Sequence, residues 1–161
     1  MKPVKTEVLR INSRRPNDRI IARASKLINS GEIVAFPTET VYGLGANALD
    51  PSAISKIYQM KGRPSDNPLI VHIADMKTLR GLVIEISPRA MRIIKKFWPG
   101  PVTLVLKKSK IVPKVTTGGL DTIAVRMPRN RIALALIKKS GFPIAAPSAN
   151  ISGRPSPTNA S

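Results

Sequence analysis

The chain has 161 residues, of which 42% are hydrophobic, enough for one domain with its own core, and its net charge of +18 favours polyanionic partners such as nucleotides or RNA. Because it contains no cysteine and one histidine, disulfides, thiolate metal sites, a cysteine nucleophile and a multi-histidine zinc site are excluded. No apolar run is long enough to span a bilayer and the N-terminus lacks the apolar segment of a secretion signal, so we expect a cytoplasmic protein without membrane contact.

The N-terminal part of the chain predicts a helix, a strand and a loop. Asn17 or Asp18 can cap a helix whose apolar residues share one face, and Gly31 ends it. A short buried strand follows at Ile33–Phe36. The next stretch, Pro37–Gly45, is too rich in threonine and glycine for a second regular element so soon. We therefore expect a loop at the carboxyl end of the strand, where open α/β sheets bind ligands.

A second helix, starting at Asp50 and Pro51, leads into a polar loop whose two cations, Lys61 and Arg63, flank a glycine. The glycine lets the backbone approach a bound oxyanion that both cations can reach, although a solvated basic turn has the same residues. Neither G-x-x-x-x-G-K-[ST] nor G-x-G-x-x-G occurs. The loop feeds a buried strand at Leu69–Ile73. Because loop cations bury little surface, we expect that replacing either one leaves folding almost unchanged.

The second half of the chain again alternates helices and strands. Asp75 can cap a short helix, and Ser87 starts another whose Phe97 and Trp98 are expected to face inward. The remaining predicted elements are a strand at Val102–Leu106, a basic connection at Lys107–Gly119, a strand at Thr122–Arg126, a helix from Asn130 to Gly141, and a strand at Ile144–Ala146. No helix separates the first two of these strands, so the sheet should be mixed. The predicted fold is α/β, with a single twisted mixed β-sheet and flanking helices.

Polar residues follow the last predicted strand. Ser148-x-Asn150 could bind phosphate or magnesium, although the same residues fit an ordinary turn. His72 stands at the polar end of an apolar strand, where a lone histidine also fits a structural role. Glu39 is the acid of the threonine-rich loop, and we assign it no role because loop carboxylates are usually solvated. The other acids are scattered, which argues against a paired-carboxylate hydrolase or a two-metal site.

Three motifs in this order resemble the YrdC-like family of threonylcarbamoyl-adenylate synthases, in particular its long archaeal and bacterial members: Pro37–Leu44, Lys61-x-Arg63 and Ser148-x-Asn150. The resemblance covers about residues 17–158. It implies the open-sheet fold of that family, with residues 1–161 forming one YrdC-like domain. Compared with the family, the chain is expected to lack the last elements of this domain and the second domain of the long members.

The resemblance implies a nucleotidyltransferase, namely an L-threonylcarbamoyladenylate synthase. Such an enzyme joins L-threonine, bicarbonate or CO2, and ATP into threonylcarbamoyl-AMP and releases pyrophosphate. The product serves the synthesis of threonylcarbamoyladenosine in tRNA, so the implied partners include a downstream threonylcarbamoyl transferase and tRNA or another RNA. Mg2+ would enter with ATP, and no metal would be held by protein side chains alone.

By the same resemblance, Lys61 and Arg63 are the catalytic cations, which would balance negative charge on the phosphoryl oxygens. The implied ATP-binding residues are Lys61, Arg63, Asn67, Thr122, Ser148, Asn150 and Ser156. The implied L-threonine-binding residues are Thr40, His72, Arg126 and the backbone of Ala146. A planar guanidinium such as that of Arg126 suits a bidentate grip on the amino acid's carboxylate.

Two other functions stay open. A non-catalytic double-stranded RNA-binding module of the same fold would also use the positive charge. The YrdC-like module of a hydrogenase-maturation carbamoyltransferase is another alternative, but the cysteine-rich zinc motifs of those proteins are missing from this sequence. Tight ATP binding would favour the synthase, whereas strongly salt-dependent duplex RNA binding without nucleotide affinity would favour the module.

Overall fold

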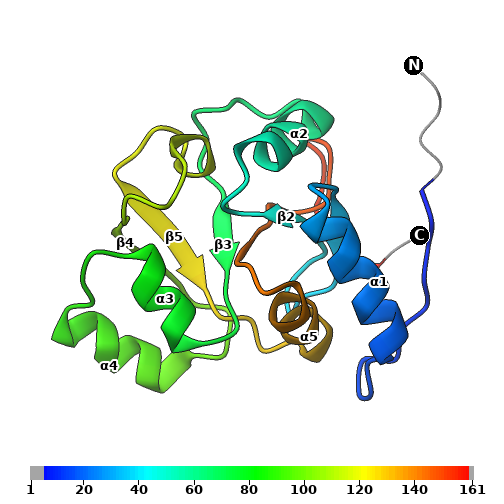
Figure 1. Cartoon of the computed structure of the whole chain (residues 1–161), viewed down its shortest axis with the longest axis horizontal. Helices are drawn as coiled ribbons and strands as arrows, with labels where there is room; N and C mark the ends of the chain where they lie inside the picture. Colours follow the sequence, from blue (N-terminus) through cyan, green and yellow to red (C-terminus); the bar gives the residue numbers. More distant parts are fainter. Residues whose placement is uncertain (1–5, 160–161) are drawn as a thin grey trace.

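The computed structural model describes residues 6–159, and these form one mixed sheet of six strands with helices on both faces (Figure 1). The strands are β1 (Val34–Phe36), β2 (Gly43–Asn47), β3 (Ile70–His72), β4 (Thr103–Lys107), β5 (Thr122–Arg126) and β6 (Ile144–Ala145). Their order across the sheet is β1-β2-β6-β3-β5-β4. Only β3 and β5 pair in parallel among these strands, and the other neighbours are antiparallel. The predicted mixed sheet with flanking helices is confirmed.

Each α-helix begins where the sequence places a capping side chain. The helices are α1 (Asp18–Asn29), α2 (Pro51–Lys61), α3 (Met76–Leu82), α4 (Pro88–Phe97), α5 (Arg131–Ser140) and the short 3-10 helix η1 (Lys114–Thr117). The side chains of Asn17, Asp50, Asp75, Ser87 and Asn130 accept hydrogen bonds from backbone N–H groups of the first turns. Within the described part of the chain, no helix has the length and apolar character needed to cross a membrane.

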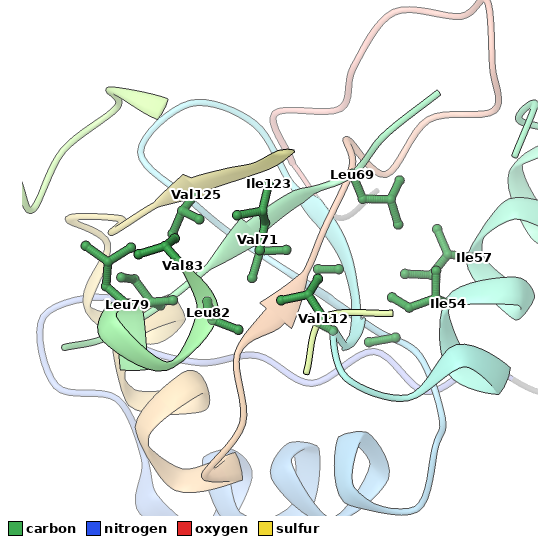
Figure 2. Packing of buried hydrophobic residues seen from close by; sticks show 14 of the residues in the cluster. Ile54, Ile57, Leu69, Val71, Leu79, Leu82, Val83, Val112, Ile123 and Val125 are labelled. Atoms are coloured by element: carbon green, nitrogen blue, oxygen red, sulfur yellow. The ribbon is translucent and has the colours of Figure 1, made fainter. Parts of the chain in front are cut away.

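The larger core cluster packs one face of the sheet against α2, α3 and α4. Figure 2 shows Val71 of β3 between Ile54 and Ile57 of α2 and Leu79 and Leu82 of α3. All five side chains are fully buried. Burying an aliphatic side chain of this kind stabilises the fold by about 1.5–3 kcal/mol, so this cluster is a main source of stability.

The opposite face of the sheet is only partly covered. Figure 1 shows α1 and α5 side by side, and their apolar residues pack with Phe36 and Ile144 over the β1, β2 and β6 end of the sheet. Successive strand residues point to opposite faces, so Ile70 and His72 point away from Val71 and toward this second face. The site described below lies there.

The prediction of a loop over the whole of Pro37–Gly45 is wrong, because its last residues begin β2. Glycine has a low strand propensity, but here a larger residue would not fit. A Cβ added to Gly45 would lie 2.5 Å from a ring carbon of Phe36 and 2.7 Å from Cγ2 of Ile144. The glycine in β2 therefore lets the Phe36 ring lie directly on the neighbouring strand.

The prediction that Phe97 faces inward is also wrong, since this residue is 43% exposed. It is the last residue of α4, where the chain turns away from the helix. Trp98 packs against the larger core cluster in its place, and its indole N–H donates to the carbonyl oxygen of Val102 at 2.7 Å. The ammonium group of Lys96 lies 5.5 Å from the centre of the exposed Phe97 ring.

We expect Gly45→Ala to lower the free energy of unfolding by about 1–3 kcal/mol, because the new methyl group overlaps Phe36 and Ile144. Gly81→Ala is the matched control, since nothing lies within 4 Å of a Cβ added there. That change, in α3, should be neutral or stabilising by up to about 1 kcal/mol. Urea unfolding of the two variants measures the difference, and equal stabilities would contradict the proposed crowding at Gly45.

Candidate active site

A pocket of about 340 Å³ opens on the second face of the sheet, beside the ends of β3, β5 and β6. Loops from several parts of the chain line it: the segment between β1 and β2, the loop ahead of β3, and the turn after β6. Six of the predicted site residues are in the lining, namely Thr40, Arg63, His72, Arg126, Ala146 and Ser148. The residues expected for the amino acid thus share one cavity with two of those expected for the nucleotide.

Arg126, the last residue of β5, is buried with all three side-chain nitrogens in contact with oxygen. Nε donates to the carbonyl oxygen of Gly100 at 3.3 Å, and Nη1 donates to the hydroxyl of Thr40 at 3.3 Å. Nη2 forms an ion pair with Oε1 of Glu39 at 2.7 Å, without the alignment of a hydrogen bond. These contacts hold the guanidinium group at the wall of the pocket.

Glu39 is the functional candidate that the sequence reasoning missed. Besides the ion pair, its Oε1 accepts a hydrogen bond from the backbone N–H of Arg129 at 3.2 Å, and the side chain is only 21% exposed. Burial by itself would raise the pKa of this carboxyl, but the hydrogen bonds and the charge of Arg126 outweigh burial and lower it. The sequence held a weak signal, because Glu39 is the acid of the threonine-rich loop and a charged side chain that becomes buried is usually paired.

His72 is buried in the pocket wall, with the edge of the Phe36 ring at a centroid distance of 6.2 Å. Burial, reinforced by the positive charge of Arg126, lowers the pKa of the imidazole from 6.5 to about 4. The ring is therefore neutral at pH 7. Nδ1 is itself buried and makes no hydrogen bond among the described atoms.

Arg63 is held by uncharged oxygen atoms of its own loop. Its Nε donates to the carbonyl oxygen of Asn67 at 3.2 Å, and Nη2 donates to the Asn67 side chain at 2.5 Å and to the carbonyl oxygen of Pro68 at 3.1 Å. Gly62, with φ of 58°, ends α2 in the left-handed region and starts this loop. Asn67 thus contacts Arg63 and does not line the pocket.

The sequence predicts Lys61 as a loop cation, but in the structure it is the last residue of α2 and is buried, with 3% of its surface exposed. Its ammonium group donates to the backbone carbonyl oxygens of Ser148 and Asn150. Burial, together with the charge of Arg63, lowers the pKa of Lys61. The premise of the expectation that its replacement leaves folding almost unchanged is therefore wrong, because this side chain is buried and ties α2 to the turn after β6.

The remaining predicted nucleotide residues lie outside the pocket lining. The side-chain oxygen Oδ1 of Asn150 accepts hydrogen bonds from the hydroxyl groups of Ser148 and Ser156. Thr122 begins β5 and so lies at the other end of that strand from Arg126. Among residues 6–159, no three His, Cys, Asp or Glu side chains gather as metal ligands.

Several known proteins that are similar to this chain are named threonylcarbamoyl-AMP synthase. A family model described as "Telomere recombination" (Sua5_yciO_yrdC) matches residues 26–161. The threonylcarbamoyl-AMP synthase of Pyrococcus abyssi is 64% identical over 137 residues, which are 85% of this chain and 40% of that protein. The enzyme of the same name from Bacillus subtilis is 58% identical over 146 residues, 89% of this chain and 42% of that protein.

A solved structure supports the same comparison. The crystal structure of P. abyssi Sua5 complexed with L-threonine matches with a TM-score of 0.89 and 61% identity, covering 91% of this chain and 43% of that one. The chain thus spans less than half the length of these relatives.

We expect Lys61→Met to lower the free energy of unfolding by about 1–3 kcal/mol, because two backbone carbonyl groups lose their donor. Lys56→Met is the matched control: that ammonium group is more exposed, pairs with Glu32 at 3.0 Å and donates to the single carbonyl oxygen of Gly31 at 2.8 Å, so its loss should cost only about 1 kcal/mol. Amide hydrogen exchange of Ser148–Ser152 should speed up in Lys61→Met alone. Unchanged exchange there would argue against the tether.

The pKa of His72 predicts an acid-dependent loss of stability. Unfolded His72 takes up its proton near pH 6.5 and the folded form near pH 4, so between these values the unfolded state binds more protons. Stability should therefore fall as the pH drops from 6.5 to 4, by up to about 3 kcal/mol. Urea unfolding from pH 4.5 to 8 should show this slope in the wild type and a shallower one in His72→Gln. Identical slopes would mean that His72 titrates normally.

Proposed function

The chain belongs to the Sua5/YciO/YrdC family, and we propose that it forms threonylcarbamoyl-AMP and pyrophosphate from L-threonine, bicarbonate or CO2, and ATP. The observation that carries this proposal is the pocket in which Arg63 and Arg126 face a common space with His72 and Ser148. One cation can serve a carboxylate and the other a phosphate. The name shared by the relatives and the L-threonine bound to P. abyssi Sua5 support the same assignment.

In this proposal, L-threonine lies at the Arg126 end of the pocket. Arg126 binds the carboxylate of the amino acid, with Thr40 and the backbone of Ala146 beside it. His72 is neutral at pH 7, and in this proposal its uncharged ring forms part of the wall against which L-threonine packs. The amine takes up CO2 to give a carbamate, whose oxygen then attacks the α-phosphorus of ATP.

ATP lies at the Arg63 end, where Arg63 and Lys61 balance the charge that develops on the phosphates. Lys61 gives two of its three N–H donors to carbonyl oxygens, so the third can donate to a phosphate oxygen while both carbonyl contacts are kept. The other residues assigned to the nucleotide are Asn67, Thr122, Ser148, Asn150 and Ser156. Mg2+ enters with ATP and is held mainly by its phosphates.

The wider setting follows from the family. We assign the product to a threonylcarbamoyl transferase that modifies tRNA, and the reaction to the cytoplasm. The net charge of +18 would favour direct contact with tRNA or another RNA by attraction to phosphate.

The test of the activity uses ATP, L-threonine and labelled bicarbonate. We expect pyrophosphate and a labile labelled adenylate that both require L-threonine, because the carbamate is the nucleophile. Chromatography of the nucleotide products, together with a pyrophosphate assay, shows which phosphorus of ATP is attacked. ADP as the main product, or AMP release independent of L-threonine and bicarbonate, would contradict the mechanism. Salt-dependent duplex RNA binding without ATP binding would instead support the non-catalytic module.

The role of Arg126 is best tested by changing the ligand, because the buried guanidinium group also supports the fold. L-threoninol, which lacks the carboxylate, should bind roughly tenfold to a hundredfold more weakly than L-threonine, since a charge-assisted hydrogen bond is worth about 1.5–3 kcal/mol. Calorimetry of the two ligands on the same preparation gives the ratio. Equal affinities would remove Arg126 from this role.

A further inference from the structure

The two guanidinium groups of the pocket differ in their charge environment. Arg126 is paired with the carboxylate of Glu39 at 2.7 Å. Arg63 contacts only carbonyl and amide oxygens, and no Asp or Glu among residues 6–159 forms an ion pair with it. The cation at one end of the cavity therefore has no paired carboxylate, whereas the cation at the other end has one.

The negative charge of Glu39 is fixed in place. Its Oε1 contacts both the guanidinium group of Arg126 and the backbone N–H of Arg129, which tie the loop after β1 to the turn after β5. The lowered pKa of Glu39 keeps the carboxylate ionised at neutral pH. Any anion that binds Arg126 must accordingly lie close to a second, immobile negative charge.

We infer that Glu39 is the residue that makes the Arg126 end of the pocket selective for a carboxylate over a phosphate group, and so directs the polyanion to Arg63. A carboxylate brings one negative charge beside Glu39, whereas phosphate at neutral pH brings between one and two and is repelled more strongly. The selectivity is needed because both ends share one cavity of about 340 Å³. This inference rests on the proposed function for the identity of the carboxylate ligand, L-threonine.

The test compares Glu39→Gln, which keeps the shape of the side chain and removes its charge, with the wild type. Calorimetry measures L-threonine binding with and without inorganic phosphate. In Glu39→Gln, phosphate should raise the apparent Kd for L-threonine about tenfold more than in the wild type. Glu39→Asp, which retains a carboxylate, should restore resistance to phosphate.

Glu32→Gln is the matched control for net charge. It removes one negative charge from an ion pair with Lys56 that lies outside the pocket, so phosphate competition should stay as in the wild type. An equal rise in Glu32→Gln and Glu39→Gln would overturn the inference, because the effect would then come from total charge. Unchanged competition in Glu39→Gln would overturn it as well.

Two further readouts keep the inference separate from the proposed function and from any folding defect. Direct titration with phosphate should find one more bound ion in Glu39→Gln than in the wild type. This readout does not depend on L-threonine, so a failure of both proteins to bind L-threonine would defeat the proposed function and leave the inference standing. If Glu39→Gln does not fold, the selectivity for a carboxylate over a phosphate group is measured on the wild type. The aminophosphonate analogue of threonine should then bind at least about tenfold more weakly than L-threonine, and equal binding would overturn the inference.

Discussion

A positive charge inside a protein must be surrounded by oxygen atoms, because an unpaired buried ion costs several kcal/mol or more. Lys61 and Arg126 are both buried, and their partners lie far away in the sequence. Lys61 binds the carbonyl groups of Ser148 and Asn150, 87 and 89 residues later, and Arg126 binds Thr40, 86 residues earlier. The need to satisfy two buried cations thus joins the loops at the ends of β1, β5 and β6 and the end of α2, and the pocket is the space between those loops.

Local chemistry made most of the fold predictable. The five helices start at Asn, Asp or Ser side chains that cap them, and their apolar spacing shows which side packs on the sheet. The sequence does not reveal the strand β2, because the glycine residues in it are required by contacts with residues distant in the sequence. Gly45 is required by Phe36 and Ile144, and the contact with Ile144 is made between residues about a hundred positions apart. Such a requirement appears only when the strands are paired.

The site was predictable in its residue types and less so in its electrostatics. Thr40, Arg63 and Ser148 stand in the three motifs, His72 and Arg126 are implied by the family resemblance, and the structure brings all five to one cavity. Lys61 is buried although a cation after a last helical turn is expected to be solvated, and Glu39 forms an ion pair although its loop position suggests a free carboxylate. A lysine at the end of a helix and an acid in a threonine-rich loop are normally solvated. Here each is held by groups that only the folded chain supplies.

The net charge of the chain and the charges around each guanidinium group therefore determine different properties of the protein. The excess of Lys and Arg favours polyanions in general, but the partners of each guanidinium group determine where an anion can bind. The position that contacts Arg63 is Asn67, whose amide oxygen fixes the guanidinium group without neutralising it. The position that contacts Arg126 is Glu39, whose carboxylate both fixes the guanidinium group and balances its charge. On our inference, an amide at one end and a carboxylate at the other give the two guanidinium groups different preferences, and the pocket takes a carboxylate ligand beside a phosphate.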